Sequence, residues 1–303
     1  MSKRLISATA SEVLKMAREE LKEAIKASEG RVICAESLSV YKPVVDELTT
    51  AELDVAFGAD MCLLNLFDVN KPYIAGLNKE DSFIPQYNAD EESIRKLKKY
   101  VGRPVGINLE PININADMME SRIDIADGRK VSEANLLKAN ELGCDFICIT
   151  GNPETGVDNA SILNAIRLAK KHFKGLIMAG KMHSSGVDEA VADVEVIGEF
   201  VKAGADIVLV PAIGTIQGFN EDMLMRVVEN AHRHNALVMS TIGTSQEGAS
   251  ESVIEQMAIR NKVCGVDIQH IGDLSRKENI YAISMAIRGQ RHSYNRIAQS
   301  INR

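Results

Sequence analysis

The stretch FGADMCLLNLFD, residues 57–68, decides the fold because its pattern occurs three more times along the chain. The other copies are LGCDFICITGNP (142–153), AGADIVLVPAIG (203–214) and CGVDIQHIGD (264–273). In each copy a glycine can end a helix in the left-handed conformation, and an aspartate can satisfy the following turn. A run of apolar residues then suits a parallel strand that is covered on both faces. The repeat therefore predicts four equivalent strands.

Four runs with a different start alternate with these copies. They are GRVICAES (30–37), GRPVGINLEP (102–111), KGLIMAGKMH (174–183) and NALVMSTIGT (235–244). Helical patterns fill the gaps between strands. Eight units with two interleaved strand types favour an α/β fold of the closed (β/α)8 TIM-barrel class over an open doubly wound sheet, because the barrel interior is built in layers from alternate strands.

The whole chain, 1–303, is predicted to form one barrel domain. Residues 1–29 contain an amphipathic helix over 8–28, which we expect to cap the bottom of the barrel, although a helix for oligomer contacts would show the same pattern. The connections 69–101 and 112–130 are longer than the others. Long loops that follow strands usually build function in barrels, so we expect these two to cover an active site rather than to be surface excursions.

Composition excludes several classes of protein. The net charge is −7 and the basic residues are scattered, so nothing indicates nucleic-acid binding. The chain has no long apolar run that could span a bilayer, and its first residues turn polar too early for a signal peptide. We expect a cytoplasmic protein without membrane contact.

Cysteine and aromatic usage gives no sign of a cofactor. No CxxC pair offers zinc ligands, and the five cysteines lie in or beside apolar runs, as small core residues do. The chain lacks tryptophan, so platforms for flat ring cofactors are scarce. The C-terminal run RGQRHSYNRIAQSINR (288–303) leaves a homo-oligomer open, although helical spacing alone would give the same pattern.

Polar side chains follow the predicted strands at the ends where barrel enzymes place their active sites. These residues are Glu36, Asn65, Asp68, Asn108, Glu110, Thr150, Asn152, Lys181, His183, Thr241, Gly243, Thr244, Ser245, Gly272 and Asp273. Because side chains alternate along a strand, Asn108 and Glu110 point the same way. By the same register we expect Ile177, Ala179, Lys181 and His183 to share one direction, which brings Lys181 and Glu110 into the mouth of the barrel.

Lys181 and Glu110 are the predicted catalytic pair. A lysine and a glutamate desolvated together shift each other's protonation, and such a pair can move a proton beside a carbonyl or form a Schiff base. The alternative is a structural ion pair that closes the barrel mouth. His183 is a third catalytic candidate, as a general acid or a metal ligand, against the alternative of a solvated loop histidine.

The remaining strand-end residues are predicted to bind substrate. Asn108, Thr150 and Asn152 would orient it, together with Glu36 and Asp68. A phosphate would lie on the backbone amides of the last two loops, at Gly243, Thr244, Ser245 and Gly272. Asp273 argues against a phosphate there, because two negative charges repel, and glycine and serine after a strand are also ordinary turn residues.

Two further residues look catalytic but have simpler roles. Asp267 falls on the same position as Asp60, Asp145 and Asp206, at the bottom of its strand, so we interpret it as a turn residue. His270 should point inward from the middle of its strand. Buried polar groups seldom lack a partner, so we expect a hydrogen-bonded interior histidine.

The segments GADMCLLNLFD, RPVGINLEP, GCDFICITGNPETGV and AGADIVLVPAIGT resemble those of BtpA-like barrels, which are similar to phosphate-binding and phosphoenolpyruvate-mutase-like (β/α)8 barrels. The resemblance covers most of residues 30–275. It implies acidic residues at strand ends that hold Mg²⁺, and the matching positions here are Glu36, Asp68 and Glu110. The mobile loop with a catalytic cysteine found in phosphoenolpyruvate-mutase-like enzymes has no counterpart in this sequence. Lys181 and Glu110 are similar to the Lys and Glu of sugar-phosphate epimerases on related barrels.

Three hypotheses follow. The first is an isomerase, epimerase or aldolase-like lyase that binds a small phosphorylated or carboxylated, hence anionic, metabolite without a required cofactor. The second is a Mg²⁺-dependent lyase or mutase that acts on a phosphoenolpyruvate-like substrate. The third is a ligand-sensing or assembly protein that uses a barrel scaffold without catalysis.

Overall fold

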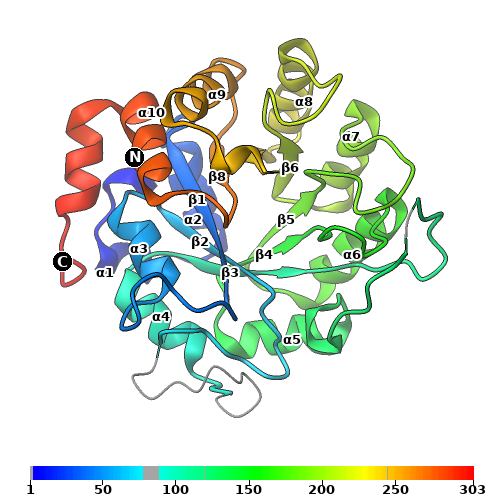
Figure 1. The fold of residues 1–303 in the computed structure, drawn as a ribbon, viewed down its shortest axis with the longest axis horizontal. Helices are drawn as coiled ribbons and strands as arrows, with labels where there is room; N and C mark the ends of the chain where they lie inside the picture. Colours follow the sequence, from blue (N-terminus) through cyan, green and yellow to red (C-terminus); the bar gives the residue numbers. More distant parts are fainter. Residues whose placement is uncertain (1–2, 78–88, 120, 244) are drawn as a thin grey trace.

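A computed structural model of the chain describes residues 3–77, 89–119, 121–243 and 245–303. Eight parallel strands, each paired with the next along the chain and the last with the first, close into a barrel, which confirms the predicted fold class (Figure 1). The strands are β1 (Val32–Leu38), β2 (Met61–Asn65), β3 (Val105–Leu109), β4 (Phe146–Ile149), β5 (Leu176–Gly180), β6 (Ile207–Pro211), β7 (Leu237–Ile242) and β8 (Ile268–Ile271).

Helices surround the barrel, and three short segments precede it. The helices after the strands are α3 (Thr50–Ala56), α4 (Ser93–Val101), α5 (Glu133–Leu142), α6 (Asn159–His172), α7 (Val194–Ala203), α8 (Glu221–Arg233), α9 (Glu251–Val263) and α10 (Lys277–Ala298). The N-terminal segments are η1 (Leu5–Ser7), α1 (Ala10–Val13) and α2 (Arg18–Lys26), and short 3-10 turns lie in two loops, η3 (Asp127–Arg129) and η4 (Gln246–Gly248). None of the helices in the described ranges is long and apolar enough to cross a bilayer.

The repeated aspartates fasten neighbouring strands at the bottom of the barrel. Each carboxylate accepts a hydrogen bond from a backbone N–H near the start of the preceding strand. The four bonds are Ile33 N to Asp60, Val105 N to Asp145, Ile177 N to Asp206 and Val238 N to Asp267, all 2.8–2.9 Å long. Asp267 is therefore a structural residue, as its alignment predicts.

Each of these aspartates also has a cationic partner from a helix. Asp60 pairs with Arg288, Asp145 with Lys98, Asp206 with Arg18 and Asp267 with His232. Because the carboxylates are largely buried, both the backbone donor and the cation offset the loss of their hydration. The repeat in the sequence thus corresponds to one structural device used four times.

Alternate strand residues form two layers. The inner layer includes Cys34, Leu63, Phe146, Leu176, Met178 and Met239, and the outer layer, against the helices, includes Ile33, Leu64, Ile107, Ile177, Ala179 and Val238. The expected orientation of β5 is wrong. Phe146 pairs with Gly106 on one side and with Leu176 on the other, so Leu176 faces inward and Ile177 faces the helices. A slip of one residue reverses every side chain of a strand.

The N-terminal segment caps the bottom of the barrel, but as two helices rather than one. Leu5, Ile6, Leu21 and Ile25 are fully or almost fully buried against the inner layer. The second helix starts anew because the Glu20 carboxylate accepts a hydrogen bond from Ala17 N, where the backbone is extended. The break lets the apolar residues on both sides of it reach the barrel.

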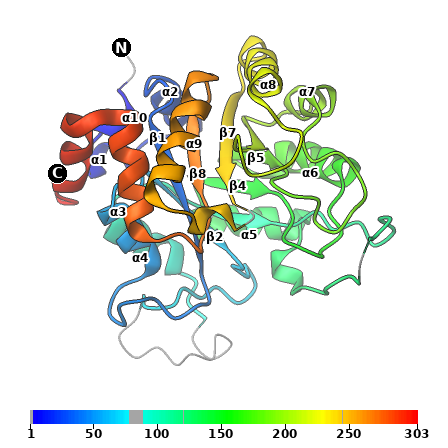
Figure 2. The ribbon, with the colours of Figure 1, turned by 45° about the horizontal axis from the view of Figure 1, so that its top comes forward.

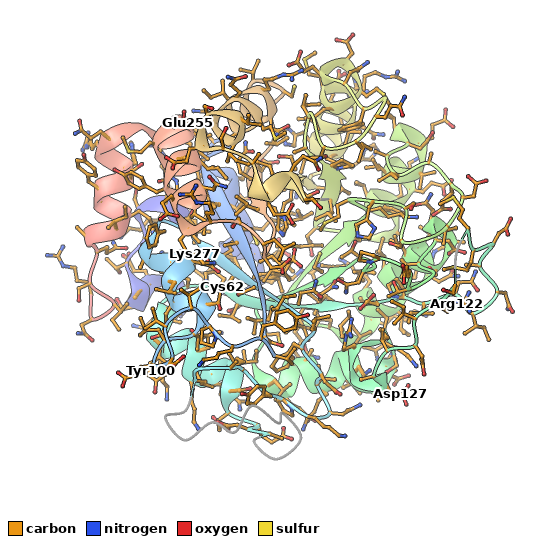
Figure 3. The ribbon with its side chains drawn as sticks, viewed as in Figure 1. Cys62, Tyr100, Arg122, Asp127, Glu255 and Lys277 are labelled. Atoms are coloured by element: carbon orange, nitrogen blue, oxygen red, sulfur yellow. The ribbon has the colours of Figure 1, made fainter. Side chains whose placement is uncertain are left out.

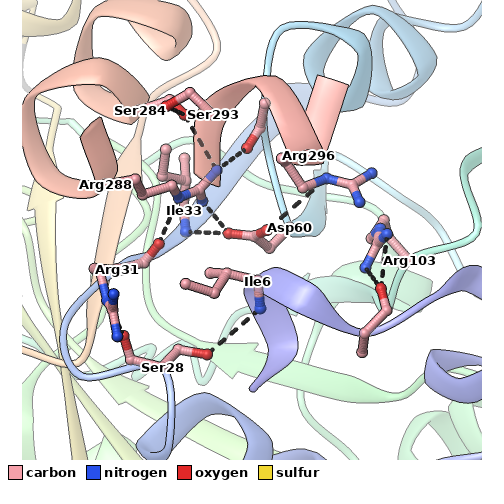
Figure 4. Close-up of polar contacts among 12 residues, drawn as sticks. Ile6, Ser28, Arg31, Ile33, Asp60, Arg103, Ser284, Arg288, Ser293 and Arg296 are labelled. Carbon is pink, nitrogen blue, oxygen red and sulfur yellow. Dashed lines mark hydrogen bonds and ion pairs between the residues drawn. The ribbon is translucent and has the colours of Figure 1, made fainter. Parts of the chain in front are cut away.

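The C-terminal helix closes over this cap through a cluster of buried arginines (Figure 4). α10 bends at Gly289, whose φ of 71° is in the left-handed region that favours glycine. Arg288 donates to the carbonyls of Arg31 and Gly58 and pairs with Asp60, which also lies 3.9 Å from Arg296. Arg103 donates to Ala8 O, so the cluster links the N-terminal segment, three strands and α10.

The 112–130 connection lies over the loops that follow β4 and β5. Ile123 N donates to Glu154 O, and Met119 N donates to Gly186 O at 2.8 Å. Arg122, near the right edge of Figure 3, fastens the outer part of this connection by donating to Ile114 O at 2.7 Å. Of the 69–101 connection, residues 78–88 lie outside the described residues. The 112–130 connection is thus positioned to cover the end of the barrel.

Candidate active site at the carboxyl ends of the strands

A cavity of about 380 Å³ opens at the carboxyl ends of the strands. Its charged and amide lining residues are Glu36, Asn65, Asn152, His183, Glu247 and Asp273. The described part of the chain also has a larger hollow of about 690 Å³ beside α2, lined by residues such as Lys3 and Glu12. That hollow is at the bottom of the barrel, where TIM-barrel enzymes do not place catalytic residues. Another hollow, of about 470 Å³, lies beside α6 and is lined by residues such as Glu110, Lys130 and Ala160. The cavity of about 380 Å³ is the candidate active site because residues that follow several different strands line it together.

A network of buried amides and carboxylates forms one wall of the cavity. Asn65 Nδ2 donates to Glu36 Oε1 at 2.6 Å and to Asn152 Oδ1 at 2.8 Å. Asn152 in turn donates to Glu110 through its backbone N–H and its side-chain amide, at 2.9 and 2.8 Å. The network holds Glu36 and Asn152 at fixed positions on the cavity wall.

Glu110 is the inner end of this network. Its side chain is 1% exposed and also accepts from Arg129 Nη2 at 2.6 Å. Arg129 belongs to the 112–130 connection, so the ion pair fastens that connection to the end of β3. The predicted inward direction of Asn108 and Glu110 agrees with the outer position of Ile107 and Leu109.

Lys181 and Glu110 do not meet. Lys181 Nζ pairs instead with Glu189 Oε1 at 2.6 Å, and no ion pair joins it to Glu110 within the described part of the chain. The side chain of Lys181 is 1% exposed, and neither Lys181 nor Glu189 lines the cavity. The reversed orientation of β5 explains this position, because Lys181 continues the outward series of Ile177 and Ala179.

His183 does line the cavity. Its Nδ1 accepts a hydrogen bond from Ser185 N at 3.0 Å, so the neutral ring carries its proton on Nε2. Burial, and secondarily the charge of Lys181, lowers the pKa of His183 below its usual value. At neutral pH the residue is a neutral hydrogen-bond donor rather than a cation.

Two of the predicted substrate-orienting residues lie beside this network with unused hydrogen-bonding capacity. Asn108 Nδ2 donates to Asn65 Oδ1 at 3.2 Å, while its own Oδ1 has no partner in the described residues. The same holds for Thr150 Oγ1, which is buried. Buried polar atoms normally have a partner, but neither residue lines the cavity, so their predicted contact with substrate stays a prediction.

The predicted phosphate-binding residues also line the cavity, together with two acidic side chains. Gly243, Ser245 and Gly272 line the cavity, and Thr244 lies outside the described residues. Glu247 is 4% exposed, and a Cβ added to Gly272 would lie 3.2 Å from its carboxyl carbon. Two carboxylates, Glu247 and Asp273, therefore flank the place predicted for phosphate.

Asp273 has the most altered acidity among the cavity residues with a resolved change. Burial raises its pKa from 3.8 to about 6, and the negative charges of Glu36 and Glu247 act in the same direction. A carboxyl group with such a pKa can both donate and accept a proton near neutral pH. The sequence shows Asp273 only as an obstacle to phosphate, and only the fold brings Glu36 and Glu247 to it.

His270 is fully buried in the barrel interior, as predicted. Its Nε2 lies 3.0 Å from Glu36 Oε2, yet neither ring nitrogen makes a hydrogen bond of acceptable geometry with the described residues. The expected hydrogen-bonded histidine is therefore wrong in this detail. Its position below Glu36 still places an imidazole next to a cavity carboxylate.

The three acids that the resemblance assigns to Mg²⁺ are not gathered. Asp68 lines a separate hollow with Lys71 and Arg129, and its carboxylate accepts from Asn70 N at 2.8 Å. Glu110 is occupied by Arg129 and Asn152. Within residues 3–77, 89–119, 121–243 and 245–303, no group of three His, Cys, Asp or Glu side chains could hold a metal ion. The residues present do not fit the implied Mg²⁺ site.

Several solved structures show a distant similarity to this chain. A candidate dihydrodipicolinate synthetase from Pseudomonas aeruginosa is 12% identical, with 88% of this chain and 76% of that chain covered and a TM-score of 0.50. A candidate lyase/mutase from Burkholderia cenocepacia J2315 is 16% identical, with 83% and 81% covered and a TM-score of 0.49. The YdjI aldolase from Escherichia coli K12 is 12% identical, with 90% and 95% covered and a TM-score of 0.48. At such identities the likeness concerns the fold alone.

Sequence comparison gives the family. No curated protein matches the chain. The narrower resemblance to BtpA-like barrels is not tested by these comparisons and stays a prediction. A family model described as a domain of unknown function (DUF7916) matches residues 6–303, so the chain belongs to that family.

Proposed function

We propose that the chain is an acid–base enzyme, an isomerase or lyase, that acts on a small molecule in the cavity at the carboxyl ends of the strands. The observation that carries the proposal is the position of Asp273 beside Glu36 in this cavity, with a pKa of about 6. Two carboxyl groups in different surroundings can take the separate roles of acid and base.

The surroundings assign these roles. Glu36 lines the cavity, and Asn65 fixes its carboxyl group by donating a hydrogen bond to Oε1 at 2.6 Å. Asp273 keeps its proton to a higher pH because it is partly buried next to other negative charges. We therefore assign Glu36 as the base and Asp273 as the acid, with the Nε2–H of His183 as a donor to a substrate oxygen.

Lys181 and Glu110 have positioning roles in this proposal. The ion pair of Lys181 with Glu189 holds the loop after β5, which lines the cavity, and Glu110 holds Asn152 of the cavity wall through two hydrogen bonds. A Schiff base at Lys181 would require its side chain to leave a buried pair, which costs free energy. The isomerase and lyase alternatives stay open, because both start with transfer of a proton next to a carbonyl.

Proton transfer can be tested without knowledge of the natural substrate. The protein is incubated in D₂O with small hydroxy, keto and amino compounds, and ¹H NMR follows enzyme-dependent loss of C–H signals and any bond cleavage. We expect Asp273→Asn and Glu36→Gln each to slow the reaction at least about 100-fold, the usual contribution of a general acid or base. Asp222→Asn, an exposed aspartate on α8, is the matched control.

The same assay separates the alternatives. If Lys181→Met slows the reaction about 100-fold while Asp273→Asn and Glu36→Gln remain active, Lys181 would be the catalytic residue instead. Activity is expected to survive treatment with EDTA, and its loss would favour the Mg²⁺-dependent lyase or mutase. A compound that binds but never exchanges or breaks would contradict the proposal in favour of a ligand-sensing protein.

A further inference from the structure

We propose that the cavity binds the protonated amine of a small organic cation through Glu36, Glu247 and Asp273. The inference rests on the proposed function, since it assigns a substrate class to the same site. It differs from the sequence-based expectation of an anionic metabolite in the sign of the ligand's charge.

The lining of the cavity is acidic. Glu36, Glu247 and Asp273 all face it, and none of the described residues that line it is a lysine or an arginine. The nearby cations are already engaged, Lys181 with Glu189 and Arg129 with Glu110. A phosphate would therefore meet carboxylates without a free cation to balance its charge, and like charges at this range repel.

Glu247 provides an independent indication of a cationic ligand. It is 4% exposed, and its Oε2 has no hydrogen-bond partner among the described residues. A buried carboxylate oxygen without a partner is costly, and the cost is removed when a charged donor binds. An ammonium group carries three donors, enough to reach Glu247 and one of the other two carboxylates together.

The cavity suits an organic cation better than a metal ion. Its volume of about 380 Å³ falls in the range of small-molecule sites, roughly 300–1,000 Å³. Within the described residues no triad of His, Cys, Asp or Glu is arranged for a metal. The amides of Asn65 and Asn152, which also line the cavity, can bind hydroxyl or carbonyl groups on the rest of the molecule.

Calorimetric titration of the full chain at constant ionic strength tests whether the cavity prefers a positively or a negatively charged ligand. The cationic probes are 1,3-diaminopropane and ethanolamine, and the anionic probes are inorganic phosphate and glycerol 3-phosphate. We expect the amines to bind and the phosphates not to bind. Glu247→Gln and Asp273→Asn should each weaken amine binding about tenfold or more, because each removes a hydrogen bond to a charged group. Glu251→Gln, an exposed acid on α9 with the same change of net charge, should leave binding unchanged.

Tighter binding of phosphate compounds than of amines would overturn the inference, as would no binding of either series. The inference would also be overturned if Glu251→Gln weakened amine binding as much as Glu247→Gln does, because the effect would then come from net charge alone. Binding is measured without turnover, so amine binding that persists when no compound exchanges deuterium would reject the proposed function and keep the inference. Unfolding curves of each variant confirm that it is folded.

Discussion

At the residue scale, the three cavity carboxylates differ in what surrounds them. Glu36 has an amide donor, Glu247 has an oxygen without a partner in the described chain, and Asp273 is partly buried near two negative charges. In the proposed function, the same functional group serves as a base, an unfilled acceptor and an acid. Each of these states follows from burial and neighbours, not from residue type.

The raised pKa of Asp273 predicts how stability changes with pH. Its folded pKa is about 6, above the unfolded value near 3.9, so the folded state holds more protons between these values. Its contribution to stability is complete below about pH 4 and is lost as pH rises to about 6. Asp273→Asn should then be more stable than the wild type at pH 8, by about 1 kcal/mol after allowance for solvent screening of this partly exposed group. Urea unfolding of the wild type and Asp273→Asn at pH 4 and pH 8 checks this. The same difference in stability between the two proteins at both pH values would contradict the prediction.

Glu110 should matter for stability more than an ordinary glutamate. Glu110→Ala leaves the donors of Arg129 and Asn152 without their shared acceptor, in a position that is 1% exposed. We expect a loss of about 3 kcal/mol in the free energy of unfolding. Glu199→Ala, on the exposed face of α7, should change it by less than about 0.5 kcal/mol. Urea unfolding measures both variants. Similar losses of stability in Glu110→Ala and Glu199→Ala would show that the buried network around Glu110 does not stabilise the fold more than an exposed glutamate does.

At the scale of the elements, the repeated aspartates explain why strands of two types alternate. The strand that carries an aspartate binds the first N–H groups of the strand before it, so one type supplies the carboxylate and the other the donors. A helix supplies the cation in each case. The barrel is thereby fastened at four places around its bottom, while its top is free to carry functional groups.

Among these four fastenings, the pair of His232 and Asp267 is the one whose cation comes from a histidine. The hydrogen bond to Asp267, 2.8 Å long, raises the pKa of His232 above 6.5. The resulting stabilisation is complete below pH 6.5 and is lost as pH rises through the raised pKa. His232→Ala should therefore lose up to about 1 kcal/mol at pH 5.5, since the side chain is partly exposed, and little at pH 9. Thermal or urea unfolding of the wild type and His232→Ala at pH 5.5 and pH 9 measures this difference in stability. A loss of stability that is larger at pH 9 than at pH 5.5 would contradict the prediction.

The sequence predicts the strands and their order better than it predicts the direction of their side chains. The Gly and Asp of each repeat fix where strands begin, and polar residues show where they end. In β5, however, Leu176, Ile177, Met178 and Ala179 are all apolar, so no alternation indicates which pair faces the interior. Only the pairing of Leu176 with Phe146 decides it, and this pairing moves Lys181 away from the site. Glu247 could not be found either, because its burial depends on how a loop folds.

At the scale of the whole molecule, both ends of the chain close the bottom of the barrel. The N-terminal segment fills the opening, and α10 packs over it through Arg288, Arg296 and their contacts (Figure 2 and Figure 4). Ser11 N also donates to Arg303 O at 2.8 Å, so the last residue touches the N-terminal cap. The stability of the barrel floor thus depends on contacts between opposite ends of the sequence.

Arg288 is the residue on which this closure depends most. Its guanidinium binds Asp60 and the carbonyls of Arg31 and Gly58, and its side chain is fully buried. Arg288→Met keeps most of the apolar volume but leaves a buried carboxylate whose nearest remaining cation, Arg296, is 3.9 Å away. We expect a loss of about 3–5 kcal/mol in the free energy of unfolding, as for other buried pairs that lose one partner. Arg291→Met, three residues further along α10 and exposed, should change stability by less than about 0.5 kcal/mol. Urea unfolding of the two variants decides the point: a loss below about 1 kcal/mol in Arg288→Met would mean that water or Arg296 replaces the missing cation.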